Sequence, residues 1–243
     1  MIAEVPLWAV VVIALIVAVG SFVQATIGLG LGMLGAPLIA LIEPALVPTL
    51  LLMLAIPVSS GVLWVERHHI SWRVIRWALP SRIPGTVLGV WLATAFDDRV
   101  LGIVVAVMVL VAVWLSFHAV EVRQTRVTLM GAGLAAGTAG TAAAIGGPPM
   151  AIVMAHRPPR EVRGTLSFFF VVGSVMSVVL FWLQGELPAS AVALAVGYLP
   201  IIGAMFLAGH RAHRRIPREA FRRVVLILCA VSAAVLLVKS ALG

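Results

Sequence analysis

The feature that most constrains this chain is a series of apolar runs, each long enough to cross a lipid bilayer. Leu7 to Thr26 and Val100 to Ala119 are two such runs, and neither holds an Asp, Glu, Lys or Arg. A transmembrane helix needs roughly 20 predominantly apolar residues. Soluble domains are about half apolar and about a quarter charged, whereas this chain is 62% hydrophobic and 11% charged. We therefore predict an all-α polytopic membrane protein, in which lipid covers the excess apolar surface.

Hydropathy predicts eight long spans and two shorter apolar stretches between them. The long spans cover residues 6–26, 45–65, 74–95, 100–119, 127–143, 164–183, 189–208 and 222–242. The short stretches are Met33 to Ile42, which follows the glycine-rich run 28–32, and Met150 to Ala155, which follows Gly146-Gly147-Pro148-Pro149. Each short stretch is too short to cross as a helix by itself. We therefore expect two groups of four long helices, each interrupted by one short segment.

The two short stretches correspond in sequence, which indicates a tandem duplication. Residues 35–40 (Gly-Ala-Pro-Leu-Ile-Ala) align with residues 147–152 (Gly-Pro-Pro-Met-Ala-Ile). We expect an N-terminal membrane repeat, residues 1–122, and a C-terminal repeat, residues 123–243, that together form one integral membrane domain. Pro37 and Pro148 are expected near the start of the short helices, where a missing N–H costs little.

The placement of Lys and Arg favours ten crossings over eight. With eight crossings the basic residues divide ten against six between the two sides. If each short stretch also crosses, they divide fourteen against two, Arg99 and Lys239, with Arg82 inside a span. The positive-inside rule prefers the second arrangement, and it accounts for the formal charge of +8 without nucleic acid as a partner. Five crossings per repeat is an odd number, so we expect inverted repeats with both termini outside.

Backbone that leaves the helix inside a membrane must be surrounded by protein or water, so both glycine-rich stretches are expected to face inward. A helix N-terminus offers N–H groups and partial positive charge, and two such ends meeting between inverted repeats are typical of a transporter's anion site. We therefore predict a small-anion site near the bilayer midplane. The candidate binding residues are Gln24, Thr26, Gly28, Gly30, Gly32, Gly35, Pro37, Arg82, Thr138, Thr141, Gly146, Gly147 and Pro148.

Other interpretations of these polar and small residues remain open. Arg82 either neutralises a bound anion or extends along the helix to the cytoplasmic interface. Glycines in membrane helices also serve close packing, as we expect for Gly85-x-x-x-Gly89 and Gly133-x-x-x-Gly137. Hydroxyl side chains such as Ser59 and Ser174 equally bind a ligand or join helices.

At these glycines and prolines the chain resembles the sulfite exporter TauE/SafE family, also called the 4-toluene sulfonate uptake permease family. The matching positions are Gly28, Gly30, Gly32, Gly35 and Pro37, then Gly140, Gly146, Gly147, Pro148 and Pro149. One departure is Thr141-Ala142-Ala143-Ala144, where the family is usually richer in glycine. The resemblance covers nearly the whole chain. It implies a duplicated set of membrane helices that exports or exchanges a small anion such as sulfite or an organosulfonate.

We therefore expect a secondary transporter that exports such an anion by alternating access. A passive channel and a carrier of another small anion, such as a short carboxylate, are the alternatives. An intramembrane enzyme is disfavoured because no Gly-x-Ser-x-Gly or zinc-type His-Glu motif lies at depth.

The remaining expectations concern ligands and location. We expect no cofactor and no metal, since His68-His69 and His210-x-x-His213 lie in arginine-rich loops without Cys or a carboxylate cluster. Proton coupling stays open, because no Asp or Glu lies within a predicted span. The expected partners are the anion, the lipid bilayer and, as one possibility, further copies of the chain. The expected location is a bacterial cytoplasmic (inner) membrane.

Overall fold

The computed structural model describes residues 6–117, 122–212 and 218–242, and the part it describes is helical without strands. His213 and His118 lie outside the described residues. The helices up to the middle of the chain are α1 (Leu7–Ile27), α2 (Leu31–Ala40), α3 (Val47–Glu66), α4 (Trp72–Thr94) and α5 (Asp98–Phe117). Those after it are α6 (Arg126–Ala142), α7 (Gly147–Val153), α8 (Pro159–Leu183), α9 (Ala189–Gly197), α10 (Leu199–Ala212) and α11 (Arg218–Leu242). Two 3-10 turns, η1 (Pro44–Leu46) and η2 (Arg67–His69), flank α3.

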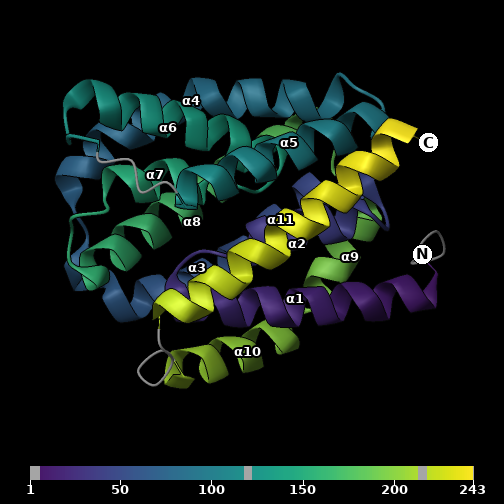
Figure 1. Cartoon of the computed structure of the whole chain (residues 1–243), viewed down its shortest axis with the longest axis horizontal. Coiled ribbons are helices and arrows are strands. Elements are labelled where there is room, and N and C mark those ends of the chain that lie inside the picture. Colours follow the sequence, from purple (N-terminus) through teal and green to yellow (C-terminus); the bar gives the residue numbers. More distant parts are fainter. Residues whose placement is uncertain (1–5, 118–121, 213–217, 243) are drawn as a thin grey trace.

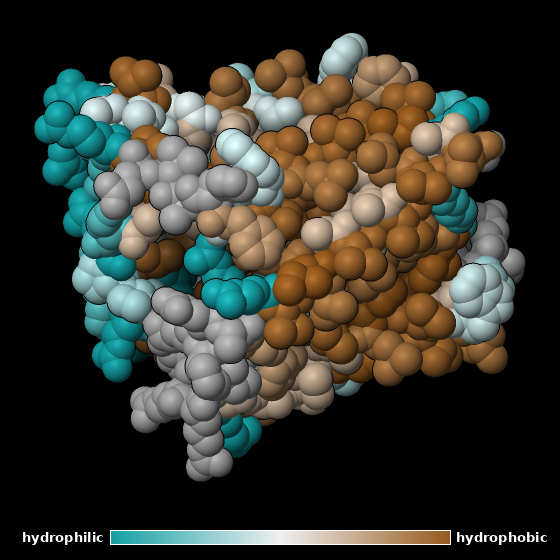
Figure 2. All heavy atoms as spheres, viewed as in Figure 1, coloured by the Kyte–Doolittle hydropathy of each residue, from teal (hydrophilic) through white to brown (hydrophobic). Residues whose placement is uncertain are grey.

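The chain is an all-α polytopic membrane protein, as predicted. Among the described residues five helices are long and apolar enough to cross a membrane, and a sixth span results if α9 and α10 count as one. Figure 2 shows the corresponding outer surface, on which hydrophobic residues cover most of the visible face and hydrophilic residues gather at one end. Such a large exposed apolar surface requires lipid.

Three of the predicted long spans differ from the prediction. The span at residues 189–208 is two helices bent by 47° around Tyr198. The spans at residues 74–95 and 127–143 are α4 and α6, but α4 carries three arginines and α6 has 17 residues, so neither passes as an apolar span by itself. They pack against each other instead, and each covers part of the other's surface.

Glycines make the contact between α4 and α6 very close. A Cβ placed on Gly85 would lie 3.1 Å from the Cα of Gly137, and one on Gly137 would lie 2.6 Å from the Arg82 carbonyl. Such approach of two helix backbones requires small residues. The prediction that the two Gly-x-x-x-Gly motifs serve helix packing is confirmed.

The two short helices are buried inside this bundle. In α2 only Leu38 is partly exposed, and the broken backbone at Gly28 and Gly30 is buried as well. The backbone between α6 and α7 is buried except for partial exposure at Ala144. Both breaks are therefore surrounded by protein, as their unsatisfied backbone groups demand.

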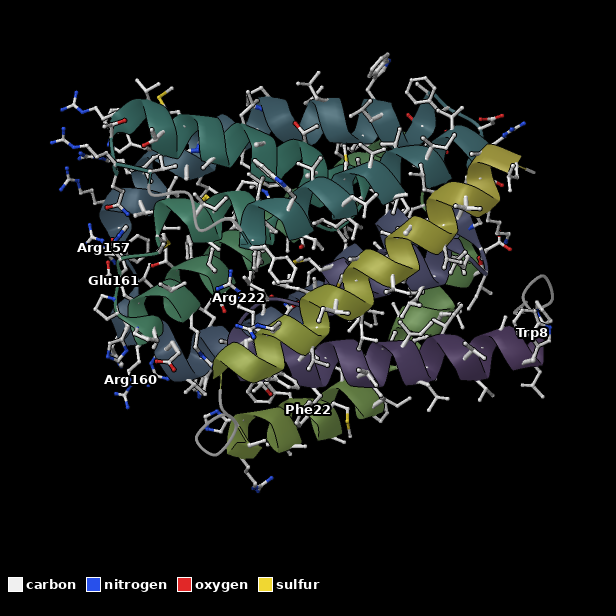
Figure 3. The ribbon with its side chains drawn as sticks, in the orientation of Figure 1. Trp8, Phe22, Arg157, Arg160, Glu161 and Arg222 are labelled. Atoms are coloured by element: carbon white, nitrogen blue, oxygen red, sulfur yellow. The ribbon has the colours of Figure 1, made fainter. Side chains whose placement is uncertain are left out.

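The bundle has two ends of different character. Arg157, Arg160 and Glu161 lie together at what we call the arginine-rich end, and Trp8 lies at the opposite end, the Trp8 end (Figure 3). Helix α1 begins and α11 ends at the Trp8 end (Figure 1).

Hydrogen bonds place the outer ends of the two short helices. Near the Trp8 end Lys239 Nζ of α11 donates to the carbonyl of Leu41, which follows α2, over 2.8 Å. At the arginine-rich end Arg157 Nη2 donates to Gln124 Oε1 over 2.6 Å, and Gln124 Nε2 donates to the carbonyl of Val153, the last residue of α7, over 3.0 Å. The two short helices therefore run from the interior to opposite ends of the bundle.

The contacts between the two halves of the chain come in matched pairs. Helix α1 packs on α10, and α6 packs on α4; α3 packs on α8, and α5 on α11. Suppose that α6, α7, α8 and α11 repeat α1, α2, α3 and α5, and that α9 and α10 together repeat α4. The contact between α1 and α10 then corresponds to that between α6 and α4, whereas the α3–α8 and α5–α11 contacts each correspond to themselves.

Candidate functional site

The first break is shaped by two glycines and a glutamine. Gly28, with φ 85°, follows the last residue of α1, and Gly30, with φ 146°, precedes α2. Glycine tolerates both values because it has no Cβ. Gln24 holds the break: its Oε1 accepts from the Leu31 N–H over 3.2 Å, and its Nε2 donates to Ser59 Oγ over 2.9 Å. The amide of Gln24 thus caps the N-terminus of α2.

The second break has a different backbone. Ala144, with φ 57°, is the one described non-glycine residue with a positive φ, and it lies in the Thr-Ala-Ala-Ala segment where the resemblance leads us to expect glycine. Helix α7 begins at Gly147, with Pro148 in its first turn as predicted. Pro37 is different, because it lies inside α2 and not at its start. By helix starts, Gly30 corresponds to Gly146, one turn away from the alignment that the prolines suggested.

The two breaks lie against each other. A Cβ on Gly32 would overlap the Ala144 carbonyl, and one on Gly147 would lie 2.5 Å from Cδ2 of Leu29. The N-terminal part of α2 therefore lies beside the second break, and Leu29 of the first break lies beside the start of α7.

A small central cavity lies where the breaks meet. Its volume is about 40 Å³. Besides both breaks, its walls come from α1, α3, α4, α6 and α8. The lining side chains and glycines are Gln24, Leu29, Gly30, Gly32, Met33, Leu51, Leu52, Ala55, Arg82, Gly140, Ala144, Ile145, Gly146, Gly147, Phe170 and Ser174.

Arg82 is the charged side chain of this cavity. It is 1% exposed, so the side chain turns inward and does not extend to the interface. Its guanidinium carbon lies 4.6 Å from the ring centre of Phe169, a cation–π distance. On α8 the guanidinium also occupies the space where Gly173 has no side chain, since a Cβ there would overlap it.

The guanidinium of Arg82 has spare hydrogen-bonding capacity. Its Nε and Nη1 are buried without a hydrogen-bond partner in the part of the chain that the structure describes. No ion pair joins it to a carboxylate of a described residue. A buried cation without a counter-charge is costly, and this one lines the central cavity.

The structure brings together some of the predicted site residues. Those that line the central cavity are Gln24, Gly30, Gly32, Arg82, Gly146 and Gly147. Thr26 and Pro148 line a neighbouring cavity instead.

The remaining candidates line neither cavity. Thr141 exchanges a hydrogen bond of 2.7 Å with Ser177, and Thr138 donates to the Leu134 carbonyl. Gly28 faces Arg163, and Gly35 faces Leu51. Pro37 is buried within α2. Their positions fit roles in helix packing and backbone geometry.

The sequence prediction missed three residues of α8. Ser174, for which a ligand role was left open, lines the cavity together with Phe170, while Phe169 and Gly173 hold Arg82. Phe169 and Gly173 are four residues apart, which is one face of a helix. That spacing was visible in the sequence, but nothing in it indicated that Arg82 would be their neighbour.

A larger cavity, which we call the vestibule, adjoins the central one. Its volume is about 350 Å³, and it shares Leu29, Gly30 and Met33 with the central cavity. Arg157, Arg163 and Arg222 line it together with Thr26 and Ser116. Arg157 belongs to the arginine-rich end, and Arg222, an exposed residue of α11, lies nearer the middle of the long axis (Figure 3). The vestibule therefore extends from that end toward the centre.

Fold and site together define an integral membrane protein with two interrupted helices around a buried arginine. The sequence model of the family described as sulfite exporter TauE/SafE matches residues 12–236. The chain therefore belongs to the sulfite exporter TauE/SafE family, a family of membrane transporters, as the glycine and proline motifs indicated. No curated protein and no solved structure matches the chain.

Proposed function

We propose that the chain is a secondary transporter that binds a small oxyanion, with sulfite as the first candidate, in the central cavity. The observation that carries this proposal is the buried guanidinium of Arg82, with two nitrogens unpartnered, at the wall of a cavity between two helix breaks. Guanidinium groups bind oxyanions through charge-assisted hydrogen bonds in a planar fork. An oxyanion in the cavity would supply the missing partner.

The helix breaks add to the attraction for an anion. The N-terminal end of α2 reaches the cavity at Gly30 and Gly32, and a helix N-terminus favours negative charge. Helix α7 has seven residues, about two turns, so its dipole is smaller. We infer that Gly146 and Gly147 serve mainly to let the anion approach the backbone closely.

Cavity size favours a compact anion. A water molecule needs roughly 10–15 Å³ of such volume, so a cavity of about 40 Å³ accepts a few non-hydrogen atoms. Sulfite has that size, and an organosulfonate needs the cavity to widen toward the vestibule. A short carboxylate is the alternative of similar size, and the family's printed description, sulfite exporter, favours sulfite.

Alternating access is the transport mechanism that we propose for the two halves, residues 1–122 and 123–243. The matched contacts between the halves and the opposite directions of α2 and α7 support inverted repeats. The arginine-rich end would face the cytoplasm by the positive-inside rule. Export would then begin in the vestibule. A passive channel would differ by showing neither saturation nor counter-exchange.

A thermal-shift screen of the purified protein tests the anion site. The ligands are sulfite, sulfate, methanesulfonate, taurine and acetate, each as the sodium salt at equal ionic strength, with sodium chloride as the control. Sulfite is expected to stabilise most, by about 2.7 kcal/mol at 100 times its Kd. Stabilisation by no anion would contradict the proposal, and a larger effect of taurine would reject the compact-anion assignment.

A further inference from the structure

Glu66, at the arginine-rich end of α3, is a buried acid in contact with cations. It was expected to lie just beyond a span, yet it is 6% exposed, and no other acidic side chain whose exposure the structure describes is buried. Its Oε1 lies 3.7 Å from Nε of Arg163, and its Oε2 lies 3.5 Å from Nδ1 of His69. Both distances exceed the 2.7–2.9 Å of a tight charge-assisted hydrogen bond. Glu66 thus attracts Arg163 without a short hydrogen bond between these atoms.

Arg163 connects Glu66 to the first helix break. Its Nη1 donates to the carbonyl of Thr26, near the end of α1, over 2.7 Å. A Cβ on Gly28 would lie 3.3 Å from Cγ of Arg163, so the side chain runs directly along the break. One guanidinium therefore contacts both an acid and the backbone that shapes the central cavity.

Arg163 also lies on the route to the central cavity. It lines the vestibule, which meets the central cavity at Leu29, Gly30 and Met33. An anion that moves between the arginine-rich end and Arg82 has to pass this wall. There it meets Arg163, whose existing counter-charge is the carboxylate of Glu66.

The carboxylate and an incoming anion compete for the same guanidinium. Two negative charges beside one cation repel each other strongly where water is largely excluded. Protonation of Glu66 removes that repulsion and leaves the positive charge of Arg163 to the anion. His69, which is exposed, gives a proton a path from water to Glu66.

The other charged groups near Glu66 are already engaged elsewhere. The guanidinium of Arg67 lies 4.7 Å from the ring centre of Trp64 and donates to the Trp64 carbonyl. Arg157, which precedes α8, pairs with Glu161 over 3.4 Å at the partly exposed rim of the vestibule. His69 and Arg163 are therefore the ionisable groups in contact with Glu66.

We propose that Arg163 is a binding site for the transported oxyanion in the vestibule, and that Glu66 takes up a proton when the anion binds there. This inference rests on the proposed function, because it assumes that an oxyanion enters the vestibule. Anion and proton then bind together, each strengthening the other's affinity by the same factor.

Sulfite titrations of the purified protein at acidic and at alkaline pH test the inference. The proteins are the wild type, Glu66→Gln and the matched control Glu161→Gln. Sulfite itself takes up a proton near neutral pH, so the informative quantity is the ratio of wild-type Kd to variant Kd at one pH, in which the state of sulfite cancels. At alkaline pH, with Glu66 ionised, the wild type is expected to bind more weakly than Glu66→Gln by roughly 5- to 150-fold, the range of coupling between two sites. At acidic pH the ratio is expected to approach one.

The control and the alternative outcomes separate this inference from the proposed function. Glu161→Gln removes an acid from a partly exposed i,i+4 pair, which is worth little, so its ratio should stay near one at both pH values. Equal Kd values for wild type and Glu66→Gln at both pH values would overturn the inference alone. Absence of sulfite binding by the wild type would overturn it together with the proposed function. If Glu66→Gln does not fold, Glu66→Asp replaces it. The shorter side chain of Asp draws the carboxylate away from Arg163, so at alkaline pH Glu66→Asp should bind sulfite more tightly than the wild type, but by a smaller factor than expected for Glu66→Gln. A Kd of Glu66→Asp equal to that of the wild type would overturn the inference.

Discussion

Arg82 depends on neighbours that carry no charge. Phe169 covers one part of its guanidinium, and the absent side chain of Gly173 leaves room for it. Arg82 itself could be found from the sequence, since it is a charge within an apolar stretch. Phe169 and Gly173 could not be linked to it, because the contact between α4 and α8 arises only on folding. The sequence correctly predicted that Gln24 lies at the first break, but only the structure shows that its side chain caps α2.

Gly173→Ala is expected to displace Arg82. The new Cβ would overlap the guanidinium, and overpacking of this kind costs typically 1–3 kcal/mol. The measurement is the thermal unfolding midpoint with and without sulfite. The variant should unfold at lower temperature and lose most of its sulfite-dependent shift. Gly203→Ala is the control, because nothing lies within 4 Å of a Cβ there. A full sulfite shift in Gly173→Ala would show that Arg82 does not need this space.

Helices α4 and α6 show which element properties can be predicted. Their existence and the role of their glycines follow from sequence spacing. Neither is both long and apolar enough to count as a span by itself, and in the structure they cover each other and not only lipid. The start of α2 was also wrong by about a turn, since Pro37 is accepted inside that helix. A buried helix tolerates such a proline when neighbouring groups satisfy the freed backbone.

Two glycines of α6 should respond to the same substitution with opposite sign. Gly133→Ala places a methyl group against the Ala78 carbonyl of α4, whereas Gly131→Ala meets nothing within 4 Å. The first variant should lose about 1–3 kcal/mol of stability through overpacking, and the second should gain up to about 1 kcal/mol through helix propensity. Thermal unfolding of both purified variants measures this. Equal stability of the two would contradict the close α4–α6 contact.

The ten-crossing topology is a prediction from arginine counting and not from hydropathy alone. Hydropathy predicts eight spans, and the positive-inside rule favours counting the two short stretches as two further crossings. In the structure α2 and α7 do run toward opposite ends of the bundle. What sequence reasoning did not supply is how the ten segments converge, because the central cavity and the vestibule are formed by residues from both halves.

Membrane orientation can be tested by cysteine labelling at Glu43 and Arg157. In a Cys229→Ala background, Glu43→Cys is expected to react with a membrane-impermeant thiol reagent added outside intact cells. Arg157→Cys is expected to react only after permeabilisation, because it lies at the arginine-rich end. Reaction of both from the same side would contradict the inverted arrangement.

Sulfite transport by reconstituted Arg82→Gln tests the central claim most directly. Arg76→Gln is the matched control, since Arg76 is an exposed arginine on the same helix. In proteoliposomes the wild type and Arg76→Gln should show saturable sulfite uptake and counter-exchange. Arg82→Gln should lose transport by at least roughly tenfold, because truncating one partner of a buried charge pair costs 2–5 kcal/mol. Folded Arg82→Gln that transports sulfite with the wild-type rate and KM would contradict a binding site at Arg82.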